Sequence, residues 1–237
     1  MSFGFAAATL AAERRLVDGL GLRPVALAPE LGGADGVLRD APVRLETRAY
    51  VGPGIGWARF ATMTSPSIDV GNLLCAPDGE RPWPILGADL VSVVPGRGML
   101  AADLSPTGDD TTEREAQVAP LARRRAVAPP LPEGGALPVW CARFFSDHHV
   151  YTRIGADRSA AALAALDDVL DAFVEVTRTM RDARDPAREA SRAATRRAYD
   201  AAHRDDDRGL DMLSRAFGAA WATRYVREVL FPGDEPR

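Results

Sequence analysis

The stretch Trp83–Pro106 constrains the fold of this chain more than any other part of the sequence. Two apolar runs, Ile85–Val94 and Met99–Leu104, flank a Pro-Gly-Arg-Gly turn. Apolar runs of this length bounded by Gly and Pro predict a β-hairpin buried in a sheet. Each run carries one carboxylate, Asp89 and Asp103, and an ionised Asp is almost never fully buried without a partner. Each is therefore either a satisfied structural group or a proton donor with a shifted pKa.

Three more strands are expected before the hairpin, at Val43–Val51, Trp57–Thr64 and Ile68–Ala76, because Gly, Pro and Ser residues separate these runs. Five successive strands joined by short connections predict antiparallel pairing, since a parallel return needs a crossover of a dozen residues. Residues 22–41 are rich in Gly and Pro and are expected to form a loop.

Helices are expected at both ends of the chain. Residues 5–20 favour a helix that ends at Gly21. In Ser159–Met180 the apolar residues follow i, i+3, i+7 spacing, which predicts a helix facing the core. Arg188–Arg204 is polar and is expected on the surface. In Leu210–Leu230 a largely aromatic row recurs every four residues and is expected to face the core: Leu213, Phe217, Trp221 and Tyr225.

Between the sheet and these helices, residues 106–136 change in character. The acidic sequence TGDDTTERE is typical of a helix start. The following LARRRAVAPPLPEGG is basic and proline-rich and is expected to be exposed and irregular. Strands first and helices after predict an α+β fold in one domain, 1–237, with one antiparallel sheet. The N-terminal helix is expected on one face and the C-terminal helices on the other.

Composition excludes several classes of function. The net charge of −4 gives no support to a nucleic-acid-binding role. Two cysteines, Cys75 and Cys141, exclude a disulfide framework and an iron–sulfur cluster ligated by this chain alone, and they fit a reducing cytoplasm. No apolar run approaches 18 residues, and the first fifteen residues lack the basic start of a secretory signal. A membrane span is therefore not expected.

Known catalytic motifs are missing from the sequence. It has no CxxC, HExxH, GxSxG or Walker loop. The adjacent histidines His148 and His149 would point to opposite sides of a strand, and the chain has three histidines in all, so no metal site is expected.

Three ordered segments resemble one enzyme family. GADLV followed by ADLSPT in the hairpin is similar to the signature of the ferredoxin-dependent bilin reductases. Pro138–Arg153 and Asp206–Phe231 resemble two further segments of that family, so the likeness runs from Leu27 to Phe231. It implies an α/β/α sandwich that holds biliverdin IXα between the sheet and the C-terminal helices. It also implies that ferredoxin supplies single electrons and that the chain binds no metal, flavin or nicotinamide cofactor.

In this family the protein supplies orientation and protons to the bilin. By resemblance, Asp89 is the central acid beside the pyrrole nitrogens, with a pKa raised by desolvation. Asp207 matches a second acid, which donates a proton to an end-ring vinyl group. Its neighbour Asp206 stands where the family has Asn and is expected in substrate binding. The other interpretation of these aspartates is a helix N-terminus stabilised by acids.

Asn72 bears on the choice of product. The branch of the family that makes phycocyanobilin has histidine at this position and a glutamate on the preceding strand, where Phe60 is the matching residue here. The branches that make phycoerythrobilin or phytochromobilin have asparagine, which forms hydrogen bonds but does not deliver a proton at neutral pH. The resemblance therefore implies reduction of the C15–C16 bridge and the A-ring diene. A buried strand Asn is otherwise a structural residue.

Arginines are candidates for binding the two substrate propionates and ferredoxin. Arg208, beside the matched acid, and Arg97, in the hairpin turn, are expected to bind propionates. Arg123–Arg125 is either a solvated face or part of a docking patch for acidic ferredoxin. The chain is expected to be a monomer.

These features predict four-electron reduction of biliverdin to phycoerythrobilin through 15,16-dihydrobiliverdin. The alternatives are a two-electron product (15,16-dihydrobiliverdin or phytochromobilin), phycocyanobilin, a different open-chain tetrapyrrole as substrate, and a non-catalytic bilin carrier.

Overall fold

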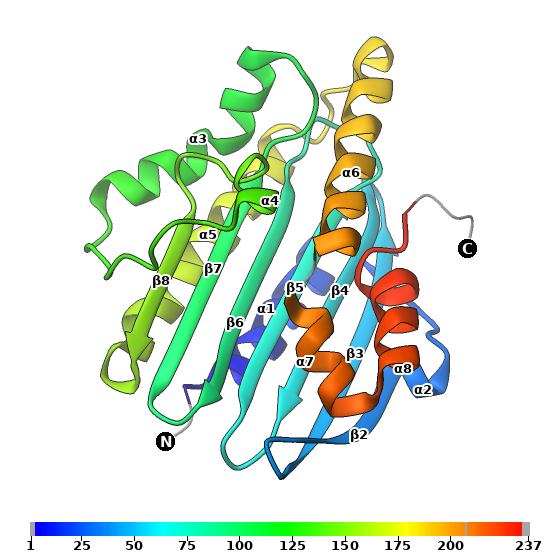
Figure 1. Cartoon of the computed structure of the whole chain (residues 1–237). Helices are drawn as coiled ribbons and strands as arrows, with labels where there is room; N and C mark the ends of the chain where they lie inside the picture. Colours follow the sequence, from blue (N-terminus) through cyan, green and yellow to red (C-terminus); the bar gives the residue numbers. More distant parts are fainter. Residues whose placement is uncertain (1–2, 207, 234–237) are drawn as a thin grey trace.

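The predicted hairpin lies inside an eight-stranded antiparallel sheet (Figure 1). The computed structural model describes residues 3–206 and 208–233. The strands follow the order β1-β3-β4-β5-β6-β7-β8, and β2 also pairs with β3. Their bounds are β1 Arg23–Val25, β2 Gly33–Leu38, β3 Ala41–Gly52, β4 Ile55–Thr64, β5 Asp69–Pro77, β6 Ile85–Val94, β7 Arg97–Ser105 and β8 Val150–Gly155.

The expectation of five strands was too low because the short strands at the edges were missed. Residues 22–41 contain β1, β2 and the short helix α2 (Pro29–Gly32), so the predicted loop was wrong. Both strands pair along β3, where Gly and Pro are tolerated because fewer ladder hydrogen bonds are required. β8 extends the opposite side of the sheet by pairing with β7.

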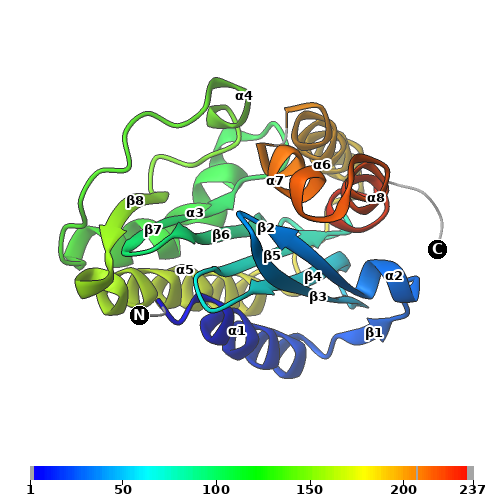
Figure 2. The ribbon, with the colours of Figure 1, turned by 60° about the horizontal axis from the view of Figure 1, so that its bottom comes forward.

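Two helical layers cover the sheet, which confirms the α/β/α sandwich (Figure 2). Helices α1, α3 and α5 lie on one face. Helices α6, α7 and α8 lie on the other, and the short α4 lies above the β6–β7 side. Their bounds are α1 Phe5–Leu20, α3 Thr111–Val127, α4 Val139–Ala142, α5 Ser159–Thr179, α6 Pro186–Asp206, α7 Arg208–Phe217 and α8 Ala219–Tyr225.

The layer on the α1 side holds the larger apolar core. Phe5 and Leu16 of α1 pack there with Leu166, Leu170 and Phe173 of α5. The predicted core-facing stripe of α5 is therefore confirmed. The expectation that all C-terminal helices cover the other face was wrong for α5, which shares its face with α1 because its stripe completes this core.

Helix α3 runs through the basic stretch that was expected to be irregular. Asp110 caps its start by accepting a hydrogen bond from the Glu113 amide at 2.8 Å. Leu121 is fully buried in the core on the α1 side of the sheet, and the helix continues as far as Val127. The irregular segment begins only after that residue.

Helix α6 was expected on the surface, but it packs closely. Its Arg192 is buried and donates hydrogen bonds to both carboxylate oxygens of Glu113 in α3, at 2.8 and 2.7 Å. Tyr199 and Asp200 of the same helix are also buried. The polar composition was misleading because arginine and carboxylate side chains here are paired inside the protein.

The C-terminal stretch is divided and is not one helix. Gly218, with φ of 93°, separates α7 from α8, and a π-helical turn, η2 (Val226–Leu230), follows. The aromatic row survives this break: the rings of Phe217 and Trp221 lie 4.7 Å apart, and those of Trp221 and Tyr225 lie 4.8 Å apart. No helix among the described residues is long and apolar enough to cross a membrane.

Candidate active site

A cavity of about 410 Å³ separates the sheet from the C-terminal helices. Its floor is the face of β4–β7 that points away from α1 and α5, and its roof comes from α4, α6, α7 and the chain end. Most of the strand residues that line the cavity are alternate positions, whose side chains point to one face of the sheet: Arg59, Ala61, Met63, Val70, Asn72, Leu74, Gly87, Asp89, Val91, Met99, Ala101 and Asp103.

Strand register brings the two predicted polar residues together on this floor. Asn72 of β5 lies directly opposite Asp89 of β6. On the other side of Asn72 the partner residue is Ala61 of β4, and on the other side of Asp89 it is Ala101 of β7. Small side chains flank the polar pair and leave room above it.

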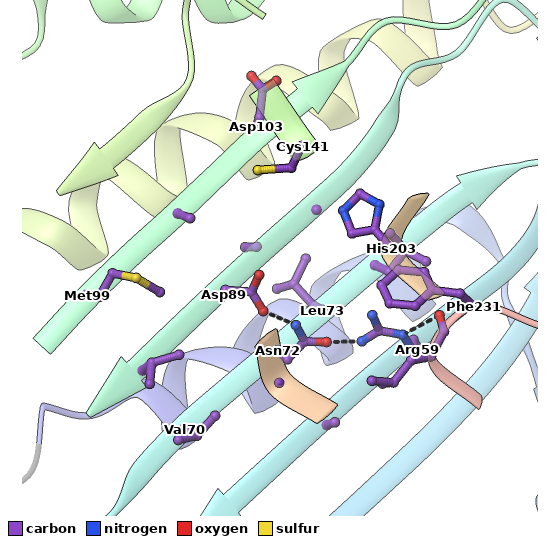
Figure 3. A pocket seen from close by; sticks show the side chains of 18 of the residues that line it. Arg59, Val70, Asn72, Leu73, Asp89, Met99, Asp103, Cys141, His203 and Phe231 are labelled. Carbon is purple, nitrogen blue, oxygen red and sulfur yellow. Dashed lines mark hydrogen bonds between the residues drawn. The ribbon is translucent and has the colours of Figure 1, made fainter. Parts of the chain in front are cut away.

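A chain of hydrogen bonds links three side chains across the floor (Figure 3). Arg59 Nη1 donates to Asn72 Oδ1, and Asn72 Nδ2 donates to Asp89 Oδ1. Arg59 Nε donates at 3.0 Å to the backbone carbonyl of Leu230, in the last residue of η2. The floor of the cavity is thus fastened to the chain end above it.

The carboxyl of Asp89 is exposed to the cavity and lies among the protein residues that line it. Desolvation there raises its pKa, while the hydrogen bond from Asn72 and the positive charge of Arg59 act in the opposite direction. A carboxyl with a raised pKa at the wall of a cavity is suited to hold a proton and give it to a bound molecule.

Asp103, on the neighbouring strand, has a different environment although it also borders the cavity. Its Oδ2 accepts a hydrogen bond from the Ser146 amide and its Oδ1 one from the Ser146 hydroxyl, both at 2.6 Å. Burial raises its pKa, and these two bonds oppose the change. The structural interpretation fits Asp103, which fastens β7 to the loop that follows α4.

Aromatic rings form the roof of the cavity above the polar chain. His203 of α6 stacks on Tyr199 at 3.9 Å and approaches Trp140 and Phe231 at 4.8 Å each. Its Nδ1 lies 2.8 Å from the Tyr199 carbonyl, which can only accept, so Nδ1 carries the proton. Burial lowers the pKa of His203 to about 4, so the ring is neutral at pH 7. The Trp140 indole nitrogen is buried without a hydrogen-bond partner among the described residues.

The structure describes only part of the site that was expected at the end of α6. Asp207 lies outside the described residues, and Asp206 and Arg208 are placed only as the last residue of α6 and the first of α7. The nearest lining residues in the sequence are His203, three residues before Asp206, and Gly209, directly after Arg208.

Two other expected residues lie elsewhere. Phe60 points to the opposite face of the sheet, where it is buried in the core of α1 and α5. Phe60 therefore does not lie beside Asn72 on the cavity floor, where Ala61 is the partner of Asn72 on β4. Arg97 is exposed at the start of β7, two residues before Met99, and is not among the described lining residues.

The basic run on α3 lies across the sheet from the cavity. Arg123 and Arg124 both donate to the carboxylate of Glu175 in α5, at 2.5 and 3.0 Å. Both arginines therefore already form an ion pair with Glu175 of the same chain. The role of Arg123–Arg125 in docking stays a prediction.

The polar lining residues that were not expected from the sequence include Arg59, His203 and Arg153. A charged residue inside an apolar strand was the signal for Asp89, and the same signal is present at Arg59. His203 gave no signal, because its partners come from α4 and the chain end. Among residues 3–206 and 208–233, no three His, Cys, Asp or Glu side chains are grouped so that they could hold a metal ion.

Comparison with known proteins shows the family to which the chain belongs. The model of the ferredoxin-dependent bilin reductase family matches residues 10–232. A phycocyanobilin:ferredoxin oxidoreductase from Synechococcus sp. is 31% identical over 222 residues, which cover 90% of this chain and 86% of that protein. A phycoerythrobilin:ferredoxin oxidoreductase from another Synechococcus strain is 29% identical over 174 residues, 69% of this chain and 65% of that protein.

The fold has a solved counterpart. The crystal structure of tomato phytochromobilin synthase in complex with biliverdin superposes with a TM-score of 0.80 and 20% identity, over 94% of this chain and 81% of that one. The family match covers nearly the whole chain and includes every strand that forms the floor of the cavity. The chain therefore belongs to the ferredoxin-dependent bilin reductases.

Proposed function

We propose that this bilin reductase converts biliverdin IXα to phycoerythrobilin through 15,16-dihydrobiliverdin. The observation that carries the proposal is the Asp89 carboxyl, which faces the cavity with a raised pKa and has Asn72 as its neighbour. Each of the two reductions consumes two electrons from ferredoxin and two protons. The chain's own residues bind the bilin, orient it and supply protons.

The cavity offers matching contacts for a flat, mostly apolar molecule with two carboxylates. Small and apolar side chains of the sheet form one wall, and the rings of Tyr199, His203 and Phe231 form the other. Arg153 of β8 lines the cavity, is exposed, and contacts the Tyr151 hydroxyl at 3.4 Å. Its guanidinium is suited to bind a propionate, a role for which Arg97 and Arg208 also stay candidates.

Asp89 is the proposed donor of the first proton, because a reduced bilin is more basic than biliverdin and the acid is held beside it. After donation, solvent must protonate Asp89 again before the next electron arrives. Asp207 is the proposed second donor. In the sequence it falls between His203 and Gly209, both of which border the cavity.

The choice of product rests on Asn72. Its amide is engaged on both sides, by Arg59 and by Asp89, and it has no proton to give at neutral pH. No carboxylate faces it from β4, where Ala61 is its partner. Protonation of the end-ring vinyl group by this pair is therefore absent from the proposed reaction, and reduction occurs at the C15–C16 bridge and the A ring.

Anaerobic turnover tests the proposal. Purified protein, biliverdin, ferredoxin and a reducing system are mixed, and the pigment is identified by absorption and chromatography against standards. Phycoerythrobilin is the expected product. Phycocyanobilin would contradict the Asn72 argument, and a product that stops at two electrons would contradict the second reduction. Biliverdin that binds without any spectral change on reduction would identify a carrier. Turnover of another open-chain tetrapyrrole, with none of biliverdin, would show that biliverdin is not the substrate.

We further propose that the chain works as a cytoplasmic monomer that holds no flavin, nicotinamide or metal of its own. Absorption and metal analysis of the purified protein test the second part, because a released chromophore or a stoichiometric metal would contradict it. Sedimentation at working concentration tests the first, since a stable dimer would contradict a monomer.

A further inference from the structure

Arg59 is held in a fixed position beneath the cavity. Its residue is 2% exposed although it lies in the floor of the site. One nitrogen, Nε, donates to the Leu230 carbonyl at 3.0 Å, and another, Nη1, donates to Asn72 Oδ1. The guanidinium also lies over the Phe231 ring at 5.3 Å. These contacts from the sheet and from the chain end leave it little freedom to turn.

The donor-only character of Arg59 fixes the direction of the neighbouring amide. A guanidinium has hydrogen-bond donors and no acceptor, and it does not lose its proton in proteins. Asn72 must therefore present its oxygen to Arg59, which turns its NH₂ group toward Asp89. The orientation of an Asn amide is otherwise decided by its network of hydrogen bonds.

The direction of the amide in turn decides where Asp89 can hold its proton. Asn72 Nδ2 only donates, so Asp89 Oδ1 must act as the acceptor. A proton on Oδ1 would oppose the amide hydrogens. The acid is therefore protonated on Oδ2, and Oδ1 has the character of a carbonyl oxygen.

We propose that Arg59 is a positioning residue that keeps the Asn72 amide in one orientation and thereby keeps the proton of Asp89 on Oδ2, where a bound bilin can receive it. The importance of this proton for catalysis rests on the proposed function. Without Arg59 the amide is free to turn over. Asp89 then donates its proton to Asn72 Oδ1, and the proton lies between the two side chains and away from the substrate.

Infrared spectroscopy of the apoprotein tests the hydrogen bond directly, without turnover. A protonated carboxyl gives a C=O stretching band, and a hydrogen bond accepted by that oxygen lowers its frequency. The band of Asp89, assigned by its loss in Asp89→Asn, is measured at a pH where the acid is fully protonated. In the parent protein we expect the lowered frequency of a bonded Oδ1.

Two substitutions and their combination isolate the role of Arg59. In Arg59→Met the Asp89 band is expected to move to higher frequency, because Oδ1 loses the amide donor. In Asn72→Leu the same upward shift is expected. The double variant should show no shift beyond that of Asn72→Leu, which separates action through the amide from a direct effect of the Arg59 charge. Arg196→Met is the control, and its Asp89 band is expected at the parent frequency. Arg196 is also a buried arginine, but it donates to the Pro77 carbonyl, at 2.9 Å.

A second variant keeps the test decisive if Arg59→Met does not fold. Arg59→Lys retains a cation that only donates, so the band is expected at the parent frequency. An upward shift in the folded Lys variant would contradict the proposal. So would an unshifted band in Arg59→Met, or a further shift in the Arg59→Met and Asn72→Leu double variant relative to Asn72→Leu.

Turnover is measured on the same proteins. Arg59→Met is expected to bind biliverdin and to reduce it at least about tenfold more slowly, which is within the contribution of a positioned general acid. Band shifts without any bilin reduction by the parent would leave the positioning role in place and contradict the proposed function. Normal turnover of Arg59→Met with a shifted band would contradict the catalytic importance of the Oδ2 proton.

Discussion

Asp89 and Asp103 lie on adjacent strands of one hairpin, and their surroundings differ in kind. Asp103 accepts two hydrogen bonds from Ser146, at 2.6 Å each, whereas Asp89 accepts one from Asn72 and faces open space. The same residue type in the same hairpin thus supports the structure at one position and is available to a substrate at the other. The sequence alone left both interpretations open for each residue.

Substitution of the two acids by Asn separates these roles. Asp89→Asn should keep biliverdin binding and lower turnover by about 10²–10⁴-fold, the contribution of general acid catalysis. Asp103→Asn should lower the free energy of unfolding by about 1–3 kcal/mol, because the Ser146 donors lose a charged acceptor. Turnover assays and denaturant titrations measure the two effects. Normal turnover by Asp89→Asn would contradict its role as proton donor.

The free energy of unfolding should depend on pH because His203 is buried as a neutral ring in the folded protein. Its pKa falls from 6.5 to about 4 on folding, so between these values the unfolded chain binds more protons than the folded one. The contribution of His203 to the free energy of unfolding, up to about 3 kcal/mol, is complete above pH 6.5. It is lost as the pH falls toward 4. His203→Phe keeps a ring against Tyr199 but cannot take up a proton. Unfolding curves should show a weaker pH dependence in this variant, and an unchanged one would contradict the assignment.

Arg153 gives the third prediction at the scale of single residues. Arg153→Gln should weaken biliverdin binding by roughly tenfold, because a charge-assisted hydrogen bond to a propionate is lost. The same substitution should not change the affinity for biliverdin dimethyl ester, which lacks the propionate charges. Arg97→Gln is the matched control on the neighbouring strand. If Arg97→Gln weakens binding and Arg153→Gln does not, the anchor lies at the hairpin turn.

At the scale of elements, the docking of α1 on β5 depends on a missing side chain. A Cβ atom at Gly71 would lie 1.9 Å from Thr9 Oγ1 and 2.8 Å from the Phe5 carbonyl oxygen. Asp69, two residues earlier, accepts hydrogen bonds from the first backbone amides of α1, at 2.8 Å from Gly4 and from Ala6. Helix and strand are thus in close contact at the point where the helix begins.

Gly71→Ala should therefore lower the free energy of unfolding by about 1–3 kcal/mol, the usual cost of overpacking. Gly19→Ala is the control within α1. Gly19 is exposed, a Cβ atom added there would meet no other atom within 4 Å, and Ala should stabilise the helix by roughly 0.5–1 kcal/mol. Thermal and denaturant unfolding measure both changes. Equal stability of the two variants would contradict the close packing of α1.

Long periodic elements could be predicted from the sequence, and short or paired ones could not. The strands β3–β7 and the helices α1 and α5 follow clear patterns of apolar residues. β1 and β2 were missed because edge strands tolerate Gly and Pro, and α6 was misplaced because Arg192 is buried against Glu113 of α3. For the site, Asp89 and Asn72 were found through resemblance. Arg59 was missed because its partner is thirteen residues away and across a strand pair.

At the scale of the molecule, two faces of one sheet have separate tasks. The face under α1, α3 and α5 holds a dense apolar core, and the face under α6–α8 holds the cavity with its polar chain. Adjacent residues of one strand serve both, since Phe60 lies in the core and Arg59 and Ala61 line the cavity. The sheet thus supports both the packed core and the cavity in which we propose that Asp89 lies beside a bound bilin.

Counting electrons tests the central claim most directly. The protein–biliverdin complex is titrated anaerobically with chemically reduced ferredoxin, and bilin absorption is followed to its end point. We predict that four equivalents of ferredoxin are consumed for each bilin, with an intermediate that is complete after two. Consumption of no reduced ferredoxin, with biliverdin still bound and unchanged, would contradict the claim that this site reduces biliverdin.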